Sequence, residues 1–278
     1  MNISTASRND VGTIVDFVKE LADYEKLSHE VEFDEKQYRD YLFDDRHEPA
    51  PHVLLAREDG PPLGFALSIH ILPAVMHLED LYVIPHARGK GIGISLLSAL
   101  ARTALDEHVR AIEWSCLDWN KTSLDFYHSI GAVPIADRVL YRITGRALQT
   151  HSFSCDLQHF SESQPGPDGK RLDVEDAKGN VIGSVWWTLS FTTFLATPVI
   201  LVTRFEASVP TALQLVDYLI HLANKGGYKR VDIRINPMIQ SELGEALCKE
   251  FQAFQLTGWI PFSLSGDALE RLAKRAVM

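Results

Sequence analysis

Hydrophobic residues recur at two spacings along the first half of the chain, and each spacing predicts one type of element. Behind Asp10, a residue type that caps helices, apolar side chains recur at helical spacing as far as Leu21, which predicts a helix ending near residues 22–26. Short apolar runs bounded by turn residues predict strands. The predicted elements are a strand at 2–5, helices at 10–22 and 34–43, strands at 52–57, 63–71 and 78–84, a helix from 92, a strand at 111–117, a helix at 120–130, and strands near 133 and at 138–143 that close the first domain.

The second half repeats the core of this order. Residues 161–169 are polar and rich in proline and glycine, which is typical of a loop or linker. The elements predicted beyond it are strands at 181–191 and 198–205, a helix at 211–223, a strand at 230–235, a helix at 240–251 and a strand at 259–264. We therefore predict a first domain at 1–147, a linker at 148–170, and a second domain at 171–278 without the two early helices.

The chain is organised around residues 77–93, where a strand runs into a glycine-rich turn and then into a helix. Pro85 ends the strand because proline cannot donate to a ladder. Glycine lets the backbone approach a ligand closely, and the first N–H groups of a helix have no partner inside it. With Arg88 and Lys90 beside it, the turn favours a phosphate-bearing ligand. The alternative is a turn that needs glycine only for its geometry.

Composition and charge limit the kinds of partner that the protein can bind. The formal net charge of −10 is spread along 278 residues, which argues against nucleic acid or an anionic membrane as a partner and suits a small cationic substrate. No apolar run is long enough to span a bilayer, and the N-terminus lacks signal-peptide character. Cys116, Cys155 and Cys248 form no disulfide or metal pattern, so we expect reduced thiols in a cytoplasmic protein. The histidines near the turn stand at no ligand spacing, so no metal is assigned.

Arg88, Gly91 and Gly93 form the pattern Arg-x-x-Gly-x-Gly behind an acidic strand, which resembles the acetyl-CoA loop of the GNAT acetyltransferases. The element order is also similar to this α/β family, whose mixed central sheet is flanked by helices and opens where its central strands splay apart. The resemblance covers roughly residues 1 to 145 and is most specific to the diamine (spermidine/spermine) and thialysine N-acetyltransferases. It rests on residues 19–25, 78–83 and 88–93, on Trp119-Asn120, and on Phe126-Tyr127 with Gly131. One departure is the short segment between Ile71 and Leu78, which lacks the aromatic-containing extension usual before the central strand.

This resemblance implies an acetyl-CoA-dependent N-acetyltransferase that acts on a small polyamine or a lysine-like amine. Such a site needs a base for an amine whose pKa is about 10, a group that polarises the thioester carbonyl, and an acid for the departing thiolate. Strand alternation places Glu79 on the face that leads to the turn, so it is the candidate base. Asp80 competes for this role or orients the cationic substrate, and Tyr127 is the candidate acid. The structural alternative for Glu79 is a solvent-facing or salt-bridged strand glutamate, and that for Tyr127 is a core tyrosine.

The remaining roles follow from the resemblance alone. The backbone N–H groups of Leu81 and Val83 would pair with the pantetheine arm and polarise the carbonyl. The residues that would hold the cofactor are Arg88, Gly89, Lys90, Gly91, Gly93 and Asn120, and those that would touch the amine are Tyr24, Glu25, Asp80 and Trp119. The alternative for the whole chain is a non-catalytic acyl-CoA-binding module that serves regulation or assembly.

The second half lacks the turn that would bind a cofactor. Residues 206–211 contain no glycine and no basic residue, so a pyrophosphate finds neither close backbone approach nor positive charge there. Trp186, Trp187, Phe191 and Phe194 are expected to pack against the first half, in the core of the second or on a partner chain, or else to line an unrelated ligand site. The resembled proteins pair as dimers, so we expect an intramolecular pseudo-dimer and leave a homodimer open.

Overall fold

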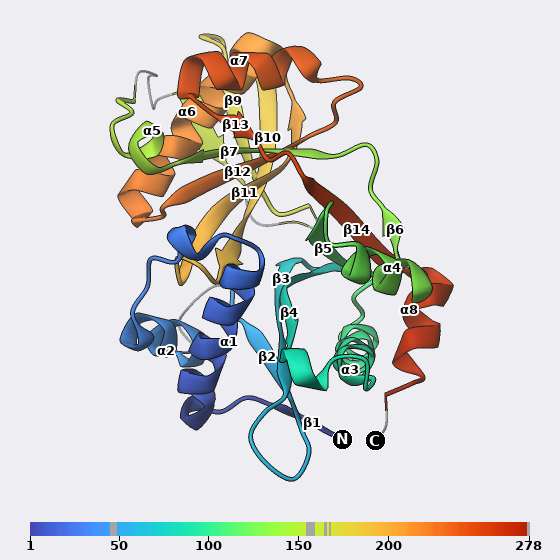
Figure 1. Ribbon diagram of the computed structural model, residues 1–278. Coiled ribbons are helices and arrows are strands. Elements are labelled where there is room, and N and C mark those ends of the chain that lie inside the picture. Colours follow the sequence, from blue (N-terminus) through green and yellow to red (C-terminus); the bar gives the residue numbers. More distant parts are fainter. Residues whose placement is uncertain (45–48, 154–158, 164–165, 167, 277–278) are drawn as a thin grey trace. The chain divides into compact units, whose positions relative to one another are not determined.

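The computed structural model describes residues 1–44, 49–153, 159–163, 166 and 168–276 of the chain (Figure 1). The chain divides into two compact units, and each unit is assembled from separate pieces of sequence. The first unit comprises Met1–Ile135, Phe191–Thr197 and Gly258–Met278, and the second comprises Ala136–Ser190 and Pro198–Thr257. The units therefore do not coincide with the two halves of the sequence.

The first unit is built on a seven-stranded sheet with the strand order β1-β2-β3-β4-β5-β14-β6. Its strands are β1 (Asn2–Thr5), β2 (His52–Arg57), β3 (Gly64–Leu72), β4 (Val75–Val83), β5 (Ala111–Leu117), β6 (Val133–Pro134) and β14 (Trp259–Ser265). Its helices are α1 (Val11–Tyr24), α2 (Glu35–Phe43), α3 (Ile92–Asp106), α4 (Lys121–Ser129) and α8 (Gly266–Ala273). Helices α1 and α2 lie on one side of the strands β2 to β4, and α3 lies on the other (Figure 1).

Local sequence accounts for these elements. The apolar face predicted for α1 is buried from Val11 to Leu21. Helix α2 begins where the side chain of Asp34 accepts a hydrogen bond of 2.6 Å from the backbone N–H of Gln37, which is an N-cap. Helix α3 buries Leu96, Leu97 and Leu100 in the core of the unit, and Leu100 is fully inaccessible. Burial of these side chains supplies the main favourable free energy of the unit.

The sheet opens between its two central strands. Strand β4 pairs in parallel with β5 at three positions, from Val75 with Ala111 to His77 with Glu113. Beyond His77, no further pairing between these strands occurs in the described residues, although β5 continues to Leu117. The second half of β4 therefore has a free backbone edge, and the glycine turn that follows it lies at the same end of the sheet.

The second unit repeats this plan on a seven-stranded sheet with the order β13-β7-β12-β11-β10-β9-β8. Its strands are β7 (Val139–Thr144), β8 (Phe160–Glu162), β9 (Lys170–Glu175), β10 (Val181–Thr192), β11 (Thr197–Glu206), β12 (Arg230–Ile235) and β13 (Phe254–Gln255), and its helices are α5 (Gly145–Gln149), α6 (Val209–Gly226) and α7 (Ser241–Phe251). Strands β11 and β12 pair in parallel, again at three positions. The predicted repeat of the core is confirmed.

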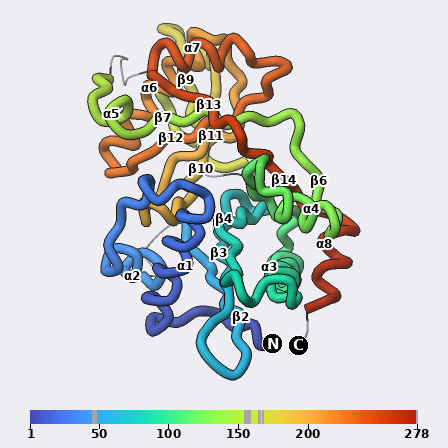
Figure 2. Tube along the Cα trace, viewed as in Figure 1, coloured from blue at the N-terminus to red at the C-terminus, as the bar shows by residue number. Residues whose placement is uncertain are grey.

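Two predicted strand assignments were wrong, because the halves exchange their strands. Strand β7 was expected to close the first domain, but it pairs with β12 in the second sheet. Strand β14 was expected to end the second domain, but it pairs with β5 along its whole length in the first sheet. In Figure 2 the green segment β7 lies with the orange strand β12, and the red segment β14 runs beside β6. The boundary expected at residue 147 thus does not separate two folding units.

Other elements were not predicted. They are the short strands β8 and β13, the strand β9, and the helices α5 and α8 that follow the exchanged strands. Parts of the predicted linker, at 154–158, 164–165 and 167, lie outside the described residues, and so does Cys155.

In the described part of the chain, no helix is long and apolar enough to cross a membrane.

Candidate active site

The turn between β4 and α3 has backbone geometry that favours glycine. Gly89 and Gly91 have φ angles of +75° and +83°, in the left-handed region. A β-carbon built at Gly89 would meet no atom within 4 Å, so the space beside it is open. Gly91 is the N-cap of α3, and no side chain of the described residues caps this helix. The N–H groups of its first turn are thus available to an anion, as a phosphate requires.

Arg88 folds back over the end of β4. Its Nε donates a hydrogen bond of 2.9 Å to the carbonyl oxygen of Val83. Its guanidinium carbon lies 5.0 Å from the ring centroid of Tyr24 and 5.6 Å from that of Tyr82, within the range of cation–π attraction. Lys90 is exposed in the turn itself. Beside the uncapped N-terminus of α3, the turn therefore carries two positively charged side chains. Arg88 stacks on two tyrosine rings, and Lys90 is exposed to solvent.

Tyr24, Trp119 and Asn120 come together between the end of α1 and the start of α4. The hydroxyl of Tyr24 donates to Oδ1 of Asn120 at 3.1 Å, and its ring centroid lies 5.6 Å from that of Trp119. The same Oδ1 accepts a hydrogen bond from the backbone N–H of Ser123, so Asn120 is the N-cap of α4. The structure thus groups three of the predicted ligand-contacting residues with Arg88.

Two adjacent carboxylates of β4 lie near the opening of the sheet. Side chains along β4 alternate between half-buried and buried, so Glu79 is half-buried and Asp80 is 5% exposed. The pairing with β3 shifts between Leu67 with Asp80 and Ser68 with Leu78, which leaves Glu79 as the extra residue of a β-bulge. Nε2 of His77 lies 3.2 Å from Oε2 of Glu79.

A third residue, from the turn between β10 and β11, contacts both carboxylates. The backbone N–H of Thr193 donates to Oε1 of Glu79 at 3.4 Å, and its hydroxyl donates to Oδ1 of Asp80 at 3.3 Å. Thr193 belongs to the first unit although its neighbours in sequence form strands of the second sheet. The other oxygen of Asp80, Oδ2, is buried and has no hydrogen-bond partner among the described residues.

Glu25 completes an acidic group with Glu79 and Asp80. Burial, and then repulsion from Glu79 and Glu30, raise the pKa of Glu25 from 4.5 to about 7. Burial, and then repulsion from Glu79 and Glu25, raise the pKa of Asp80 well above its usual range, while the hydrogen bond from Thr193 opposes this rise. Because like charges raise the pKa of Glu25 and of Asp80, a bound cation would relieve their repulsion.

Tyr127 lies behind this group in the core of the first unit. Its ring centroid is 4.9 Å from that of Trp114 and 5.7 Å from that of Phe262 on β14. Burial, followed by interaction with the Cys116 thiol and with Glu25, raises the pKa of Tyr127 well above its usual value. The hydroxyl therefore stays protonated at neutral pH.

Leu81 and Val83 lie on the part of β4 beyond its last pairing with β5. Their side chains are half-buried against the hydrophobic core of the first unit. On the side that faces the opening, this stretch of backbone has no strand partner in the described part of the chain. Its N–H groups can therefore serve a ligand that lies between the two strands.

The second unit differs at the corresponding turn. Helix α6 is capped by Ser208, whose Oγ accepts a hydrogen bond of 3.4 Å from the backbone N–H of Thr211. A β-carbon at Gly183 would lie 2.5 Å from the side chain of Thr211 and 2.9 Å from that of Ala207, so β10 packs tightly against this turn. Neither a free N–H group at Thr211 nor open space remains for a phosphate.

The expected aromatic residues fall into different places. Trp187 is buried in the core of the second unit, and Trp186 stacks with Arg171 and Arg204 at 5.2 and 4.7 Å from its ring centroid. Phe191 is fully buried in the first unit, where its ring stacks on Tyr41 at 4.3 Å. They therefore do not form one aromatic surface.

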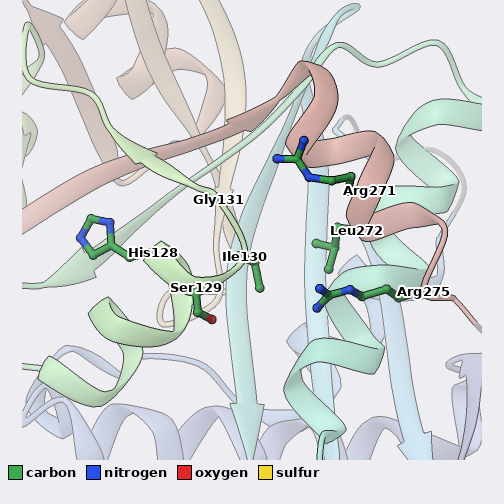
Figure 3. A pocket seen from close by; sticks show the side chains of 7 residues that line it. All are labelled: His128, Ser129, Ile130, Gly131, Arg271, Leu272 and Arg275. Atoms are coloured by element: carbon green, nitrogen blue, oxygen red, sulfur yellow. The ribbon is translucent and has the colours of Figure 1, made fainter.

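A pocket of about 170 Å³ lies elsewhere in the first unit, between the end of α4 and the helix α8 (Figure 3). It is lined by His128, Ser129, Ile130, Gly131, Arg271, Leu272 and Arg275. None of the predicted site residues lines it.

Among the described residues, no group of three or more histidine, cysteine or acidic side chains is arranged to hold a metal ion.

Sequence reasoning missed two residues of the site. Thr193 carries no motif, and its contact with β4 spans more than a hundred positions of sequence. Phe262 stacks on Trp114 with an interplanar angle of 10°, and only the pairing of β14 with β5 brings it there. The available signal was the apolar alternation of 259–264, which predicts a strand without saying which sheet it joins.

A sheet that opens between two parallel strands, with an uncapped glycine turn at the opening, is the architecture of an acyl-CoA-dependent acyltransferase. The family model described as acetyltransferase (GNAT) family matches residues 18–132. The chain belongs to the GNAT family and is an N-acetyltransferase.

Two known relatives match about half and about a third of the chain. A thialysine N-epsilon-acetyltransferase of Sus scrofa is 33% identical over 162 residues, which are 53% of this chain and 94% of the relative. An L-ornithine N5-acetyltransferase of Arabidopsis thaliana is 35% identical over 91 residues, 31% of this chain and 40% of the relative. The fold extends further: a tandem GNAT protein from the clavulanic acid biosynthesis pathway superposes with a TM-score of 0.53, at 13% identity, over 95% of this chain and 98% of its own.

Proposed function

We propose that the protein transfers the acetyl group of acetyl-CoA to a primary amine of a small polyamine or a lysine-like substrate. The observation that carries this proposal is the convergence of Glu25, Glu79 and Asp80 at the opening of the sheet. An ammonium group would relieve their mutual repulsion and would give the buried Oδ2 of Asp80 a partner. The names of the relatives point the same way, since thialysine and ornithine carry a side-chain amine.

Two residues would perform the proton transfers. Glu79 would take the proton from the attacking amine, directly or through one water, because it is half-buried at the bulge beside the opening. Tyr127 would donate its proton to the departing thiolate, since burial keeps its hydroxyl protonated over the working pH range. Asp80 and Glu25 would hold a second positive charge of the substrate, with Tyr24 and Trp119 around it.

The glycine turn fits acetyl-CoA, which supplies the activated acetyl thioester. Gly89, Gly91 and Gly93 would receive its pyrophosphate at the uncapped N-terminus of α3, with Arg88 and Lys90 as counter-charges. The backbone N–H groups of Leu81 and Val83 would bind the pantetheine arm and polarise the thioester carbonyl. Asn120 would hold the cofactor from the start of α4.

We assign catalysis to the first unit, and we assign no cofactor binding to the second unit. The capped and filled turn at Ser208 supports one cofactor site for each chain. A tandem GNAT neighbour that aligns along nearly the whole chain supports an intramolecular pseudo-dimer, and a homodimer stays open to measurement. The free thiols of Cys116 and Cys248 suit a cytoplasmic location.

The test is a mass-spectrometric screen of amines with acetyl-CoA. The panel pairs each diamine or basic amino acid with an analogue that lacks the second amine. We expect acetylation of compounds with a second positive charge, and an Asp80→Asn variant should lose this preference. Tight binding of acetyl-CoA with no acetylated product from any amine would favour the non-catalytic binding module instead.

A further inference from the structure

The turn between β10 and β11 is fixed against the active-site carboxylates by several contacts within the first unit. The backbone N–H of Glu32 donates to the carbonyl of Phe194 at 2.8 Å, and Nε2 of Gln37 donates to the carbonyl of Leu195 at 3.2 Å. The turn closes with a hydrogen bond from the N–H of Ala196 to the carbonyl of Thr193, and Ala196 has a φ of +45°. A non-glycine residue in this region is strained, so the surrounding contacts hold the turn in one conformation.

Thr193 sits at the inner end of this turn and is 1% exposed. It is the residue that joins the two carboxylates, since its N–H reaches Glu79 and its hydroxyl reaches Asp80. Consecutive strand residues normally point to opposite faces, and one residue would not contact both. Here the bulge at Glu79 turns the strand, so that a single threonine binds the pair.

The groups around Asp80 make this hydroxyl chemically important. Glu79 on its own strand, Glu25 after α1 and Tyr38 on α2 all interact with Asp80 electrostatically, and the first two disfavour its ionised form. The hydrogen bond from the Thr193 hydroxyl is the contact that favours the carboxylate form. Without it, Asp80 would bind a proton more tightly and would be neutral over a wider pH range.

We propose that Thr193 is a positioning residue of the acetyl-transfer site, which holds Glu79 and Asp80 in the arrangement and charge state that accept the amine. This inference rests on the proposed function of the two carboxylates. It gives the second half of the chain a part in substrate recognition, through a turn that contains no residue of the cofactor site.

The experiment compares full-length Thr193→Val, which keeps the shape and the N–H but removes the hydroxyl, with Thr193→Ser, which restores it. Thr188→Val removes a half-buried hydroxyl of the strand β10, which leads into this turn, and is the matched control. We expect Thr193→Val to lower kcat/KM for the amine by about tenfold, the scale of one hydrogen bond to a charged group. The acidic limb of its pH–rate profile should move to higher pH, while the KM for acetyl-CoA stays unchanged. The serine variant should keep the wild-type limb.

Carbon-13 titration of the Asp80 carboxyl, assigned with Asp80→Asn, gives a second measurement that does not need activity. If the wild type acetylates no amine, the proposed function is wrong, and the role of Thr193 is then judged from the pKa of Asp80 alone. A higher pKa of Asp80 in the valine variant, with a wild-type value in the serine variant, supports the positioning role. The positioning role is overturned if Asp80 has the same pKa in the wild type and in both variants. It is also overturned if the valine and serine variants lose rate equally and the acidic limb of the pH–rate profile does not move.

Discussion

Glu25 offers the sharpest test of the acidic group, because its ionisation should destabilise the folded protein. Its pKa rises from 4.5 to about 7 on folding, first through burial and then through repulsion from Glu79 and Glu30. The folded state therefore holds this proton more tightly than the unfolded state does. The stability that the protonated form provides is fully present below pH 4.5 and is lost as the pH rises through about 7.

The size of this effect follows from the pKa difference. At about 1.4 kcal/mol for each pKa unit, ionising Glu25 costs the folded state about 3 kcal/mol at pH 8. A Glu25→Gln variant cannot ionise, so it should be more stable than the wild type by about that amount at pH 8. At pH 4.5 the two proteins should be nearly equal. In a chain of this length, about 3 kcal/mol corresponds to a rise of roughly 6 °C in Tm.

The assay is urea unfolding of both proteins at pH 4.5, 6 and 8, with Asp16→Asn as the control. Asp16 is an exposed residue of the same helix α1, so its substitution controls for the loss of one carboxylate at the surface. Glu25→Gln should also raise the KM for the amine, because a negative charge is lost where we place the cation. A glutamine variant that is no more stable at pH 8 than at pH 4.5, relative to the wild type, would refute the reasoning.

Four further outcomes test the proposed machinery and the fold. Tyr127→Phe should lower kcat by roughly 10²-fold or more with little change in acetyl-CoA affinity, and Glu79→Gln should move the pH–rate profile to alkaline pH, where neutral amine is more abundant. Arg88→Ala combined with Gly91→Asp should weaken acetyl-CoA binding strongly in calorimetry, because a carboxylate replaces close backbone approach to an anion. Residues 1–147 expressed alone should fail to give a cooperative unfolding transition, since they lack β14 and α8.

Each of these outcomes has a clear contrary result. Wild-type kinetics in both Tyr127→Phe and Glu79→Gln across the pH range would remove the proposed acid and base. Ser208→Ala is the control for the cofactor site and should leave acetyl-CoA affinity unchanged, whereas two bound equivalents for each chain would contradict a single site. A soluble, fully active fragment 1–147 with the wild-type Tm would show that the exchanged strand is dispensable.

The sequence pattern predicted those elements whose formation depends on residues that are close together in the sequence. The alternation along β4, the glycine turn and the helix α3 follow from residues 77–104, and these elements lie where the spacing placed them. The burial of Glu25 was not predictable, because the residue lies just beyond a helix end and its neighbours come from β4. The strands β7 and β14 have similar apolar patterns, and nothing in either pattern says which sheet will take it.

The second half of the sequence has no open glycine turn, yet the strand exchange makes the first half depend on it. Phe262, Leu264, Leu269 and Leu272 are buried in the core of the first unit, although they lie at the far end of the chain. Their burial contributes on the order of 6–12 kcal/mol, comparable to the whole stability of a typical protein. Phe262 also forms the wall behind Tyr127, and Thr193 reaches the carboxylates from a different part of the same half. The first unit therefore depends on the second half of the sequence at two separate points, one behind the proposed acid and one at the proposed base. Substitutions at the capped turn of α6 should be tolerated, whereas those at positions 193 and 262 should act on catalysis as directly as changes in the first half.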